Sequence, residues 1–578
     1  MGDNTSSIYQ GGYSSLSPKY GNIFTNYRVN PRTLGMTTDP RTANIVKDAA
    51  NKFHTGARHI EISAVSPEVF ESIPNTHLEE MNRLAKLVGA TVSVHGPIVE
   101  PSGLTKEGFS DSNRQAVERQ MLSAVKRSHL VSPDGSIPVT FHSSALLPDQ
   151  IPQQGKAADS VMVISPEDGS YGAIPLKERT FPGEEKKKDA KTEIEKYNSD
   201  HWTKNIDQIG QNIRIAGDII DRTARTNILT EAEIKQGKNL SEEQEDARKQ
   251  FYQGRNYLNS SYIDLKNLFE RAVKDSSEIE KDKINKFYTE IKKDAEYVNK
   301  NPDEIKSTLL MKEIIEKGVD VLKEVHPQLV VGLNDFAKDK AAETISNVAL
   351  ESYKEFKDTA PFLSIENPPA GGAFGRGEDL RALIEESRKK FEEKAIKSGM
   401  KESDARKAAE KMIGVTWDVG HINMIRKYGY GKENVIEETE KVAPFIKHIH
   451  LSDNFGMEHT ELPMGMGNVP VKEILEKIGK EGFDAKKIIE AGNWWQHFQT
   501  PPFKETLEAF GSPIYSMNMA PYWNQNLGFQ QDYSSGYGMM LPQTNYEMFG
   551  AGFSHLPTEL GGQRPGAEGS RMSGKGME

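Results

Sequence analysis

Short runs of apolar and β-branched residues recur along the chain, and stretches with the periodicity of amphipathic helices separate them. The strand candidates are TLGMTT (33–38), RHIEIS (58–63), TVSVHG (91–96), IPVTFHS (137–143), PFLSIEN (361–367), GVTWDVG (414–420), IKHIHLSD (446–453) and KKIIEAG (486–492). The stretches between them include THLEEMNRLAKLVG (76–89) and NVIEETEKVAPF (434–445). The pattern predicts a strand followed by a helix, repeated eight times.

A chain that alternates in this way favours parallel strands joined by helical crossovers, and eight such units close into a (β/α)8 TIM barrel. We expect the barrel in two parts, residues 31–146 and 346–499. In this architecture the residues that carry chemistry lie at the carboxyl ends of the strands. Most of the candidate strands have a His, Asp or Glu at or near that end.

Residues 147–345 interrupt the repeat after the fourth strand, and we expect them to form a mostly helical insertion. The stretch VMVISPEDGSYGAIPL (161–176) predicts a hairpin with its turn at PEDG, and SSYIDLKNLFERAV (260–273) has helical periodicity. An insertion at this point leaves and re-enters the barrel at the rim formed by the carboxyl ends of the strands, where the residues that carry chemistry lie. It is either a lid or specificity subdomain, or a solvated helical decoration without contact to the site.

The two ends of the chain lack helical and strand periodicity. We expect residues 1–30 to be flexible, and residues 500–578, rich in Gly, Tyr, Met, Asn and Gln, to form a disordered low-complexity tail. Such a tail could bind a protein partner, although low-complexity termini are more often simply unpacked.

Composition narrows the kinds of site that the chain can build. It has 578 residues and no cysteine, which excludes disulfides, thiolate metal sites and cysteine nucleophiles. A formal net charge of -11 disfavours a surface devoted as a whole to nucleic acid. No apolar run approaches the roughly 20 residues that cross a bilayer. We therefore expect a cytoplasmic protein without a membrane partner.

A set of nitrogen and oxygen ligands lies at or just after the predicted strand ends. The set is His95, His142, Glu366, Asp418, His421, His450, His459, Glu461 and Glu490. One buried His is usually a core residue, and one strand-end carboxylate is usually a helix cap. Several carboxylates at one barrel mouth are costly unless cations neutralise them, and divalent metals are the ordinary solution. Imidazole with carboxylate suits zinc, manganese or iron, and no organic cofactor is indicated.

Two further residues, Glu61 and His448, lie on predicted strands near this set. His448 stands two residues before His450, so both face the same way in a regular strand. We expect Glu61 and His448 to support the metal ligands or to contact substrate, or else to pack in the barrel interior.

At these residues the chain resembles the xylose isomerase-like barrel superfamily, which contains endonuclease IV (AP endonuclease family 2) and sugar isomerases and epimerases. The motifs that carry the resemblance are SVHGP, TFHSS, SIENPP, WDVGH, HIHLSDN, LPMGMGNVP and IIEAG, in the family's order. They span residues 33–146 and 346–497 and leave the insertion and both ends unmatched.

The resemblance to endonuclease IV implies up to three zinc ions, with manganese as the alternative. His95 and His142 would hold one metal. Glu366 would bridge to a second metal, completed by Asp418, His450 and Glu490.

A third metal would take His421 with His459 and Glu461. The chain departs from the family there, because HTELPMGMGN stands where Asp-x-His and Gly-Glu-Gly-Asn are usual. Both substituted residues can ligate a metal, so the resemblance leaves the occupancy of this third site open.

The reaction follows from the number of metals. Several metals predict hydrolysis of a phosphodiester, with Glu366 beside the attacking water. The resemblance to endonuclease IV implies that the substrate is damaged DNA of the abasic-site type. The nearby loops offer little Lys or Arg for the DNA backbone, which weakens this interpretation. We nevertheless place it first, because a single-metal enzyme does not need His95 and His142.

Two alternatives remain. One metal held by Glu366, Asp418, His450 and Glu490 predicts a sugar isomerase or epimerase. The two glutamates would then act as acid and base, and His421 would contact the sugar. The other alternative is a non-catalytic binding or scaffold protein built on a barrel without metal.

Overall fold

The computed structural model describes residues 33–510 except 43, 64–65, 146, 149–150, 177–188, 225–238, 303–304, 480–484 and 499. The chain divides into two compact units. The first contains the residues up to Ala158 and those from Ala337 onwards, and the second is Asp159–Phe336. The second unit falls inside the range 147–345 expected for the insertion.

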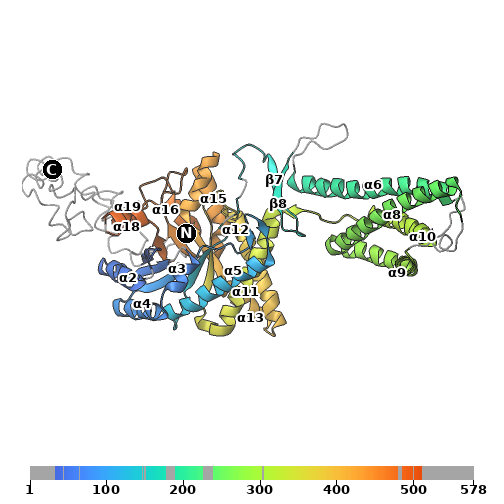
Figure 1. The fold of residues 1–578 in the computed structure, drawn as a ribbon. Helices are drawn as coiled ribbons and strands as arrows, with labels where there is room; N and C mark the ends of the chain where they lie inside the picture. Colours follow the sequence, from blue (N-terminus) through green and yellow to red (C-terminus); the bar gives the residue numbers. More distant parts are fainter. Residues whose placement is uncertain are drawn as a thin grey trace, which may run out of the picture. The chain divides into compact units, whose positions relative to one another are not determined.

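Parallel strands close a barrel in the first unit, as the sequence predicts (Figure 1). They are β1 (Leu34–Thr37), β2 (His59–Ser63), β3 (Thr91–His95), β6 (Pro138–His142), β10 (Phe362–Glu366), β11 (Ile413–Asp418), β12 (Ile446–Leu451) and β13 (Lys487–Ile489). Their order around the barrel follows the chain, and β1 closes the ring by pairing with both β2 and β13. The fold is a (β/α)8 TIM barrel, with all strand carboxyl ends at one rim.

Helices surround this barrel, and smaller elements connect them. The α-helices are α2 (Ile45–His54), α3 (Pro67–Ser72), α4 (Asn75–Val88), α5 (Asp111–Ser128), α11 (Leu333–Phe356), α12 (Gly377–Lys397), α13 (Glu402–Met412), α14 (Val419–Asn423), α15 (Lys432–Val442), α16 (Val471–Ile478), α18 (Gly492–Phe498) and α19 (Phe503–Ala509). The smaller elements are the pair β4 (Leu104–Thr105) and β5 (Gly108–Phe109), and the 3-10 turns η2 (His129–Val131), η3 (Lys357–Thr359), η4 (Met424–Tyr428) and η5 (Ala443–Phe445).

Helix α4 shows how the periodic pattern becomes structure. Leu78, Met81 and Ala85 stand three or four residues apart, so all three lie on one face, and that face is buried. The helix ends at Gly89, whose φ of 65° lies in the left-handed region that glycine adopts without strain.

Strand β11 ends two residues earlier than the predicted run 414–420, because its last residue, Asp418, begins a helix. The Oδ1 atom of Asp418 accepts hydrogen bonds from the backbone N–H groups of Gly420 and His421 at 2.7 and 2.8 Å. This side-chain cap satisfies two N–H groups at the start of α14. The turn carries His421 out of the strand and onto the rim.

The barrel interior contains hydroxyls as well as apolar side chains. Thr416 of β11 donates to Oγ of Ser364 of β10 at 2.7 Å, and its Oγ1 lies 3.0 Å from Oγ1 of Thr140 of β6. All three side chains are fully buried. Because these hydroxyls satisfy one another, their burial costs little, and the barrel accepts polar residues below its rim.

The second unit combines a small sheet with a helical bundle. Strands β7 (Ser160–Ile164) and β8 (Tyr171–Pro175) form a hairpin, in which Gly169 takes a φ of 73°. A third strand, β9 (Val331–Gly332), pairs antiparallel with β7. Its two residues are too few to give a periodic signal in the sequence.

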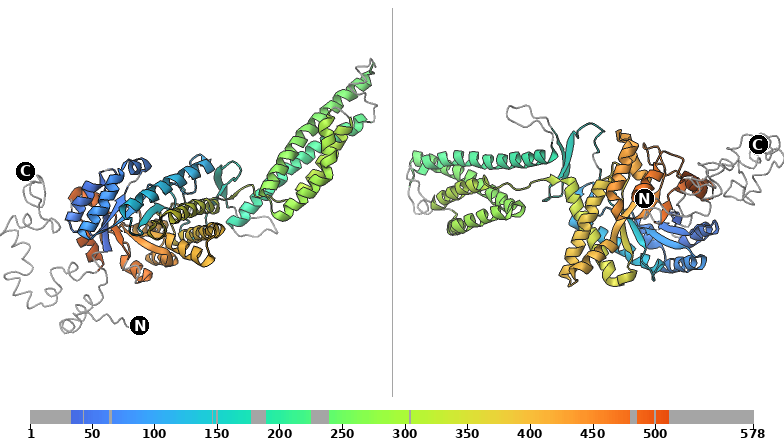
Figure 2. Two further views of the ribbon diagram at one scale, coloured as in Figure 1. Left: turned by 90° about the horizontal axis from the view of Figure 1, so that it is seen from below. Right: turned by 180° about the vertical axis from the view of Figure 1, so that it is seen from behind.

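The helices α6 (Ala190–Ala224), α8 (Glu242–Asp275), α9 (Glu278–Lys300) and α10 (Ile305–Leu322) lie side by side (Figures 1 and 2). Apolar side chains from all four form their common core. In it the indole N–H of Trp202 donates to the Leu322 carbonyl at 3.0 Å, and the rings of Phe269 and Phe287 stack with centroids 4.7 Å apart.

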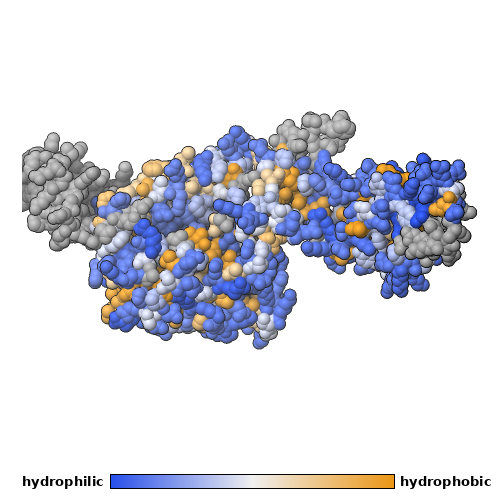
Figure 3. Space-filling view, in the orientation of Figure 1, coloured by the Kyte–Doolittle hydropathy of each residue, from blue (hydrophilic) through white to orange (hydrophobic). Residues whose placement is uncertain are grey.

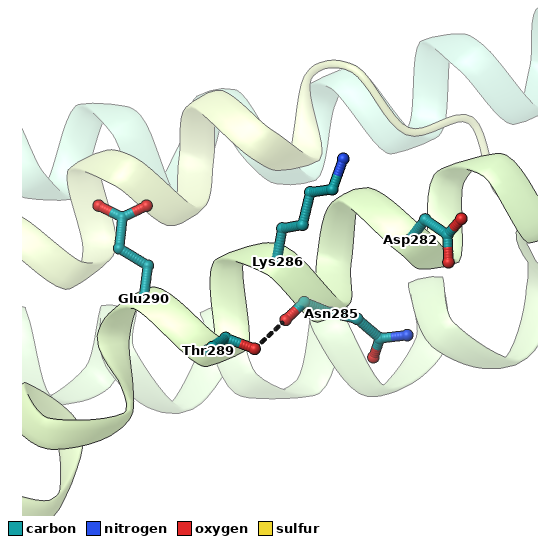
Figure 4. Close-up of a pocket in the computed structure, with 5 residues that line it drawn as sticks. All are labelled: Asp282, Asn285, Lys286, Thr289 and Glu290. Carbon is teal, nitrogen blue, oxygen red and sulfur yellow. Dashed lines mark hydrogen bonds between the residues drawn. The ribbon is translucent and has the colours of Figure 1, made fainter.

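The visible face of this bundle is mostly hydrophilic (Figure 3). A shallow hollow on α9 is lined by Asp282, Asn285, Lys286, Thr289 and Glu290, and Thr289 donates to the Asn285 carbonyl at 2.9 Å (Figure 4). These side chains come from a single helix, and the predicted site residues all belong to the other unit. Among the described residues, no helix is both long and apolar enough to cross a membrane.

Residues 503–509 form α19, although the sequence placed them in the tail. Leu507 and Phe510 are buried, so apolar packing continues past residue 500. The rest of the expected tail, from residue 511, and the expected flexible segment 1–30 lie outside the described residues.

Candidate metal centre

The parallel strands bring most of the predicted ligands to one rim of the barrel. The last residues of β3, β6, β10 and β11 are His95, His142, Glu366 and Asp418. His450 stands one residue before the end of β12. The remaining members follow a strand: Glu490 comes directly after β13, His421 lies in α14, and His459 and Glu461 lie in the loop after β12.

The site converges on Glu366, which is fully buried. Its Oε2 lies 3.1 Å from Nε2 of His95 and 3.4 Å from Nε2 of His142. Its Oε1 lies 3.0 Å from Nδ1 of His450 and 3.6 Å from Nδ1 of His421. One carboxylate thus contacts imidazoles from β3, β6, β12 and α14.

Two groups of ligand atoms share Glu366, and within each group the atoms lie within 4.8 Å of one another. The first group is His95, His142 and Glu366, and the second is Glu366, Asp418, His450 and Glu490. Ligands of a tetrahedral zinc ion stand about 3.3 Å apart, given metal–ligand distances of about 2.0–2.1 Å. The contacts of Glu366 with His95, His142 and His450 are close to this spacing.

Backbone carbonyls set the tautomers of two site imidazoles. Nδ1 of His95 lies 2.8 Å from the Gly96 carbonyl, and Nδ1 of His421 lies 2.7 Å from the Asn367 carbonyl. A carbonyl only accepts, so in each ring Nδ1 carries a proton. In the neutral rings the lone pair is then on Nε2, which can bind a metal. Nε2 of His95 faces Glu366, and Nε2 of His421 faces His459.

Asn367 also holds Asp418 in place. Its Nδ2 donates to the Asp418 carbonyl at 3.0 Å, and its Oδ1 accepts from the Asp418 N–H at 2.8 Å. Since the Asn367 carbonyl accepts from His421 as well, this one buried residue orients two neighbouring members of the site. Sequence reasoning did not select Asn367; the signal was an amide beside Glu366 at a strand end.

The predicted third group is looser than the other two. Nε2 of His421 lies 2.9 Å from Nε2 of His459, and Nε2 of His459 lies 3.7 Å from Oε1 of Glu461. The side chains of His459 and Glu461 are 33% and 38% exposed. Glu461 has a φ of 43°, in the left-handed region that costs energy for a residue with a side chain.

The loop that follows β12 is pinned by a buried carboxylate that the sequence analysis also missed. Oδ2 of Asp453 accepts from the Gly465 N–H at 2.8 Å, and its Oδ1 accepts from the Val469 N–H at 3.1 Å. The HLSDN motif thereby anchors the LPMGMGNVP segment beside the carboxyl end of β12. The signal was the polar Ser-Asp-Asn run after an apolar strand.

Two carboxyl groups of the site are shifted in opposite directions. Burial raises the pKa of Glu366, but the imidazoles of His450 and His142 outweigh it and hold that pKa well below its usual value. Burial raises the pKa of Glu490 well above its usual value; His450 opposes this shift, and the nearby carboxylates of Glu366 and Asp418 add to it. Burial also lowers the pKa of His142 to about 4, which leaves that ring neutral at pH 7.

This donor set fits a divalent cation. Oδ2 of Asp418 is buried and has no hydrogen-bond partner. In its neutral form, His95 turns the lone pair of Nε2 toward a carboxylate oxygen, and two acceptors at that distance repel unless a cation or a proton lies between them. No ion pair joins a Lys or Arg to Glu366, Asp418 or Glu490 among the residues the structure describes. A metal ion would therefore supply the charge that the side chains lack.

Glu61 and His448 lie deeper in the barrel than the other predicted residues. Both side chains are completely buried, so neither is open to a substrate. The Glu61 carboxylate lies 3.0 Å from Nε2 of His448 and 3.1 Å from Nε2 of His450. Of the predicted ligands, His450 is therefore the one that Glu61 contacts, and His448 contacts Glu61 in turn.

Residues 400–510 match the family model described as "Xylose isomerase-like TIM barrel". The resemblance is confirmed over these residues. They include β11, β12 and β13, and with them Asp418, His450 and Glu490 of the candidate metal centre.

Individual proteins are similar to this chain over parts of its length. An uncharacterized protein of Methanocaldococcus jannaschii is 32% identical over 83 residues, which are 14% of this chain and 27% of that protein. A solved D-tagatose 3-epimerase-like protein aligns with 24% identity over 32% of this chain and 59% of its own, with a TM-score of 0.23. A TM-score of this size supports no conclusion about function, and the chain spans about a quarter of the first relative's length.

Proposed function

We propose that the protein is a divalent-metal-dependent hydrolase of phosphodiesters. The observation that supports this proposal is the sharing of Glu366 between two groups of ligand atoms, because a bridging carboxylate is suited to a centre with two metals. His95 and His142 form the part of this centre that a single-metal enzyme would not need. Zinc is the metal that best suits such ligands, with manganese as the alternative.

Divalent cations bound there would supply positive charge for the phosphate oxygens and for the leaving alkoxide. The side chains do the rest. Glu366 would be a ligand shared by both ions, while His95 and His142 would present neutral imidazoles to one of them. Asn367 would keep Asp418 and His421 oriented, which fixes the site before substrate binds.

The substrate class that we propose is DNA with an abasic site, as the resemblance to endonuclease IV implies. The assay is cleavage of a duplex that contains one abasic analogue, compared with the same duplex without it. Cleavage specific to the abasic strand, lost on chelation and restored by Zn²⁺ or Mn²⁺, would support the proposal. Absence of cleavage by the metal-loaded protein would reject this substrate class.

Isomerisation or epimerisation of a sugar is the second candidate, and one observation favours it. The pKa of Glu366 is held low and that of Glu490 is raised, so one carboxylate is available as a base and the other as an acid. Conversion of a ketose to its epimer by the metal-loaded protein, without phosphodiester cleavage, would favour this candidate. If the purified protein binds no metal, a binding or scaffold role would be favoured instead.

A further inference from the structure

Glu61 occupies a buried position on β2 in which its two oxygen atoms have different partners. Oε2 accepts a hydrogen bond from Oγ of Ser93 at 2.7 Å and lies 3.0 Å from Nε2 of His448. Oε1 has no hydrogen-bond partner and lies 3.1 Å from Nε2 of His450, which has none either. Glu61, Ser93, His448 and His450 are all 0% exposed.

This contact places an acceptor beside one ring nitrogen of His450, as backbone carbonyls do for His95 and His421. In His95 and His421 the ring nitrogen Nδ1 donates to a backbone carbonyl, of Gly96 and Asn367 respectively, which leaves Nε2 free to bind a metal. In His450 the site-facing nitrogen is Nδ1, which lies 3.0 Å from Glu366 and 3.2 Å from Glu490. The remote nitrogen is Nε2, and the group that faces it is the Glu61 carboxylate.

A side chain has to serve this purpose because of where His450 lies. The strand β12 is paired on both sides, with β11 and β13, so the neighbouring carbonyls are used in the sheet. The ring of His450 points into the barrel, away from that ladder. An acceptor must therefore come from a side chain across the interior, and β2 supplies one.

We infer that Glu61 is a positioning residue for the metal centre. Its Oε1 lies 3.1 Å from Nε2 of His450, within reach of the Nε2–H, and would hold the imidazole with the lone pair of Nδ1 directed at the metal, beside Glu366 and Glu490. Ser93 and His448 hold Glu61 by donating to its other oxygen. This inference rests on the proposed metal-dependent function. Carboxylates that orient a metal-bound imidazole in this way typically change metal affinity by about 10–100-fold.

The test compares Glu61→Leu, which removes the acceptor, with Glu61→Gln, which keeps a carbonyl oxygen at nearly the same place. The matched control is Glu438→Gln, a buried carboxylate of α15 that pairs with Arg376 and Lys441. The measurement on the full chain is the dissociation constant for Co²⁺ by chelator competition, together with the Co²⁺ absorption spectrum and the melting temperature.

We expect Glu61→Leu to raise the Co²⁺ dissociation constant about 10–100-fold and to change the absorption spectrum. Glu61→Gln should stay within about 10-fold of the unchanged protein, and Glu438→Gln should lose stability but bind Co²⁺ normally. Should Glu61→Leu not fold, Ser93→Ala is measured instead and should weaken binding measurably. Co²⁺ binding and spectra that do not change in these variants would overturn the inference.

The outcome separates this inference from the proposed reaction. A protein that binds Co²⁺, depends on Glu61 for its affinity and cleaves no phosphodiester would refute the reaction and keep the role of Glu61. An unchanged protein that binds no Co²⁺ would refute both.

Discussion

Replacement of His142 by alanine separates the multi-metal centre from a single-metal one. The His142 ring is 3.4 Å from Oε2 of Glu366, and it belongs to the first ligand group but not to the second. If that group holds a catalytic metal, its loss removes charge stabilisation of about 3–4 kcal/mol, which corresponds to a 100-fold to 1,000-fold lower rate of phosphodiester cleavage.

The same substitution should cost little stability. The side chain of His142 is 16% exposed, and its pKa of about 4 leaves it neutral at pH 7. We expect a loss of about 1 kcal/mol in the free energy of unfolding. The matched control is His129→Ala, which removes an imidazole that stacks on Phe356 and bonds Thr359 elsewhere on the barrel.

The assay measures cleavage of the abasic duplex, metal content and thermal unfolding for both variants. His142→Ala should bind less metal and lose activity, while His129→Ala should keep both. Full cleavage activity in His142→Ala would refute the reasoning. Loss of ketose epimerisation with intact cleavage would reverse the order of the two candidate functions.

Three further substitutions test an orienting amide, a crowded glycine and a partly buried lysine of the barrel. Asn367→Ala should lower the free energy of unfolding by about 2–4 kcal/mol, because it leaves the Asp418 N–H and carbonyl unpaired in the interior. The same variant should bind metal more weakly in a chelator titration, and unchanged affinity would contradict the orienting role of Asn367. Gly420→Ala should cost about 1–3 kcal/mol in chemical denaturation, since its Cβ would stand 2.6 Å from the Ser452 carbonyl, whereas Gly210→Ala meets open space and should not destabilise. Burial lowers the pKa of Lys447 to about 7, below its unfolded value of about 10.4, so the folded state binds fewer protons between these pH values. Relative to Lys447→Met, the unchanged protein should therefore gain about 1–2 kcal/mol of stability as pH rises from 7 to 10, and a fall over this window would contradict the assignment.

The barrel could be predicted because its strands are short apolar runs at regular spacing, and parallel pairing then places their carboxyl ends together. That rule alone gathers His95, His142, Glu366, Asp418 and His450 at one rim. It needs no knowledge of side-chain conformation, since the pattern places the end of each of these five strands to within one or two residues.

What could not be predicted depends on contacts across the barrel. In the sequence, nothing marks Asn367 as a residue that orients the site. Only the fold shows that its side-chain amide pairs with the backbone of Asp418. The depth of Glu61 follows from the register between β2 and β3, which sets it beside Ser93. The two-residue strand β9 carries no periodic signal, and the cap at Asp418 ends β11 where hydrophobicity would have continued it.

We propose above that the imidazoles and carboxylates at the barrel mouth bind divalent metal ions. The most direct measurement is the number of metal ions per chain, by elemental analysis of full-length protein purified without chelators. We expect two or three equivalents of zinc or manganese, falling by at least one in His142→Ala. A single equivalent that is unchanged in His142→Ala would point to the sugar isomerase, and none, even after incubation with Zn²⁺ or Mn²⁺, would contradict the metal centre itself.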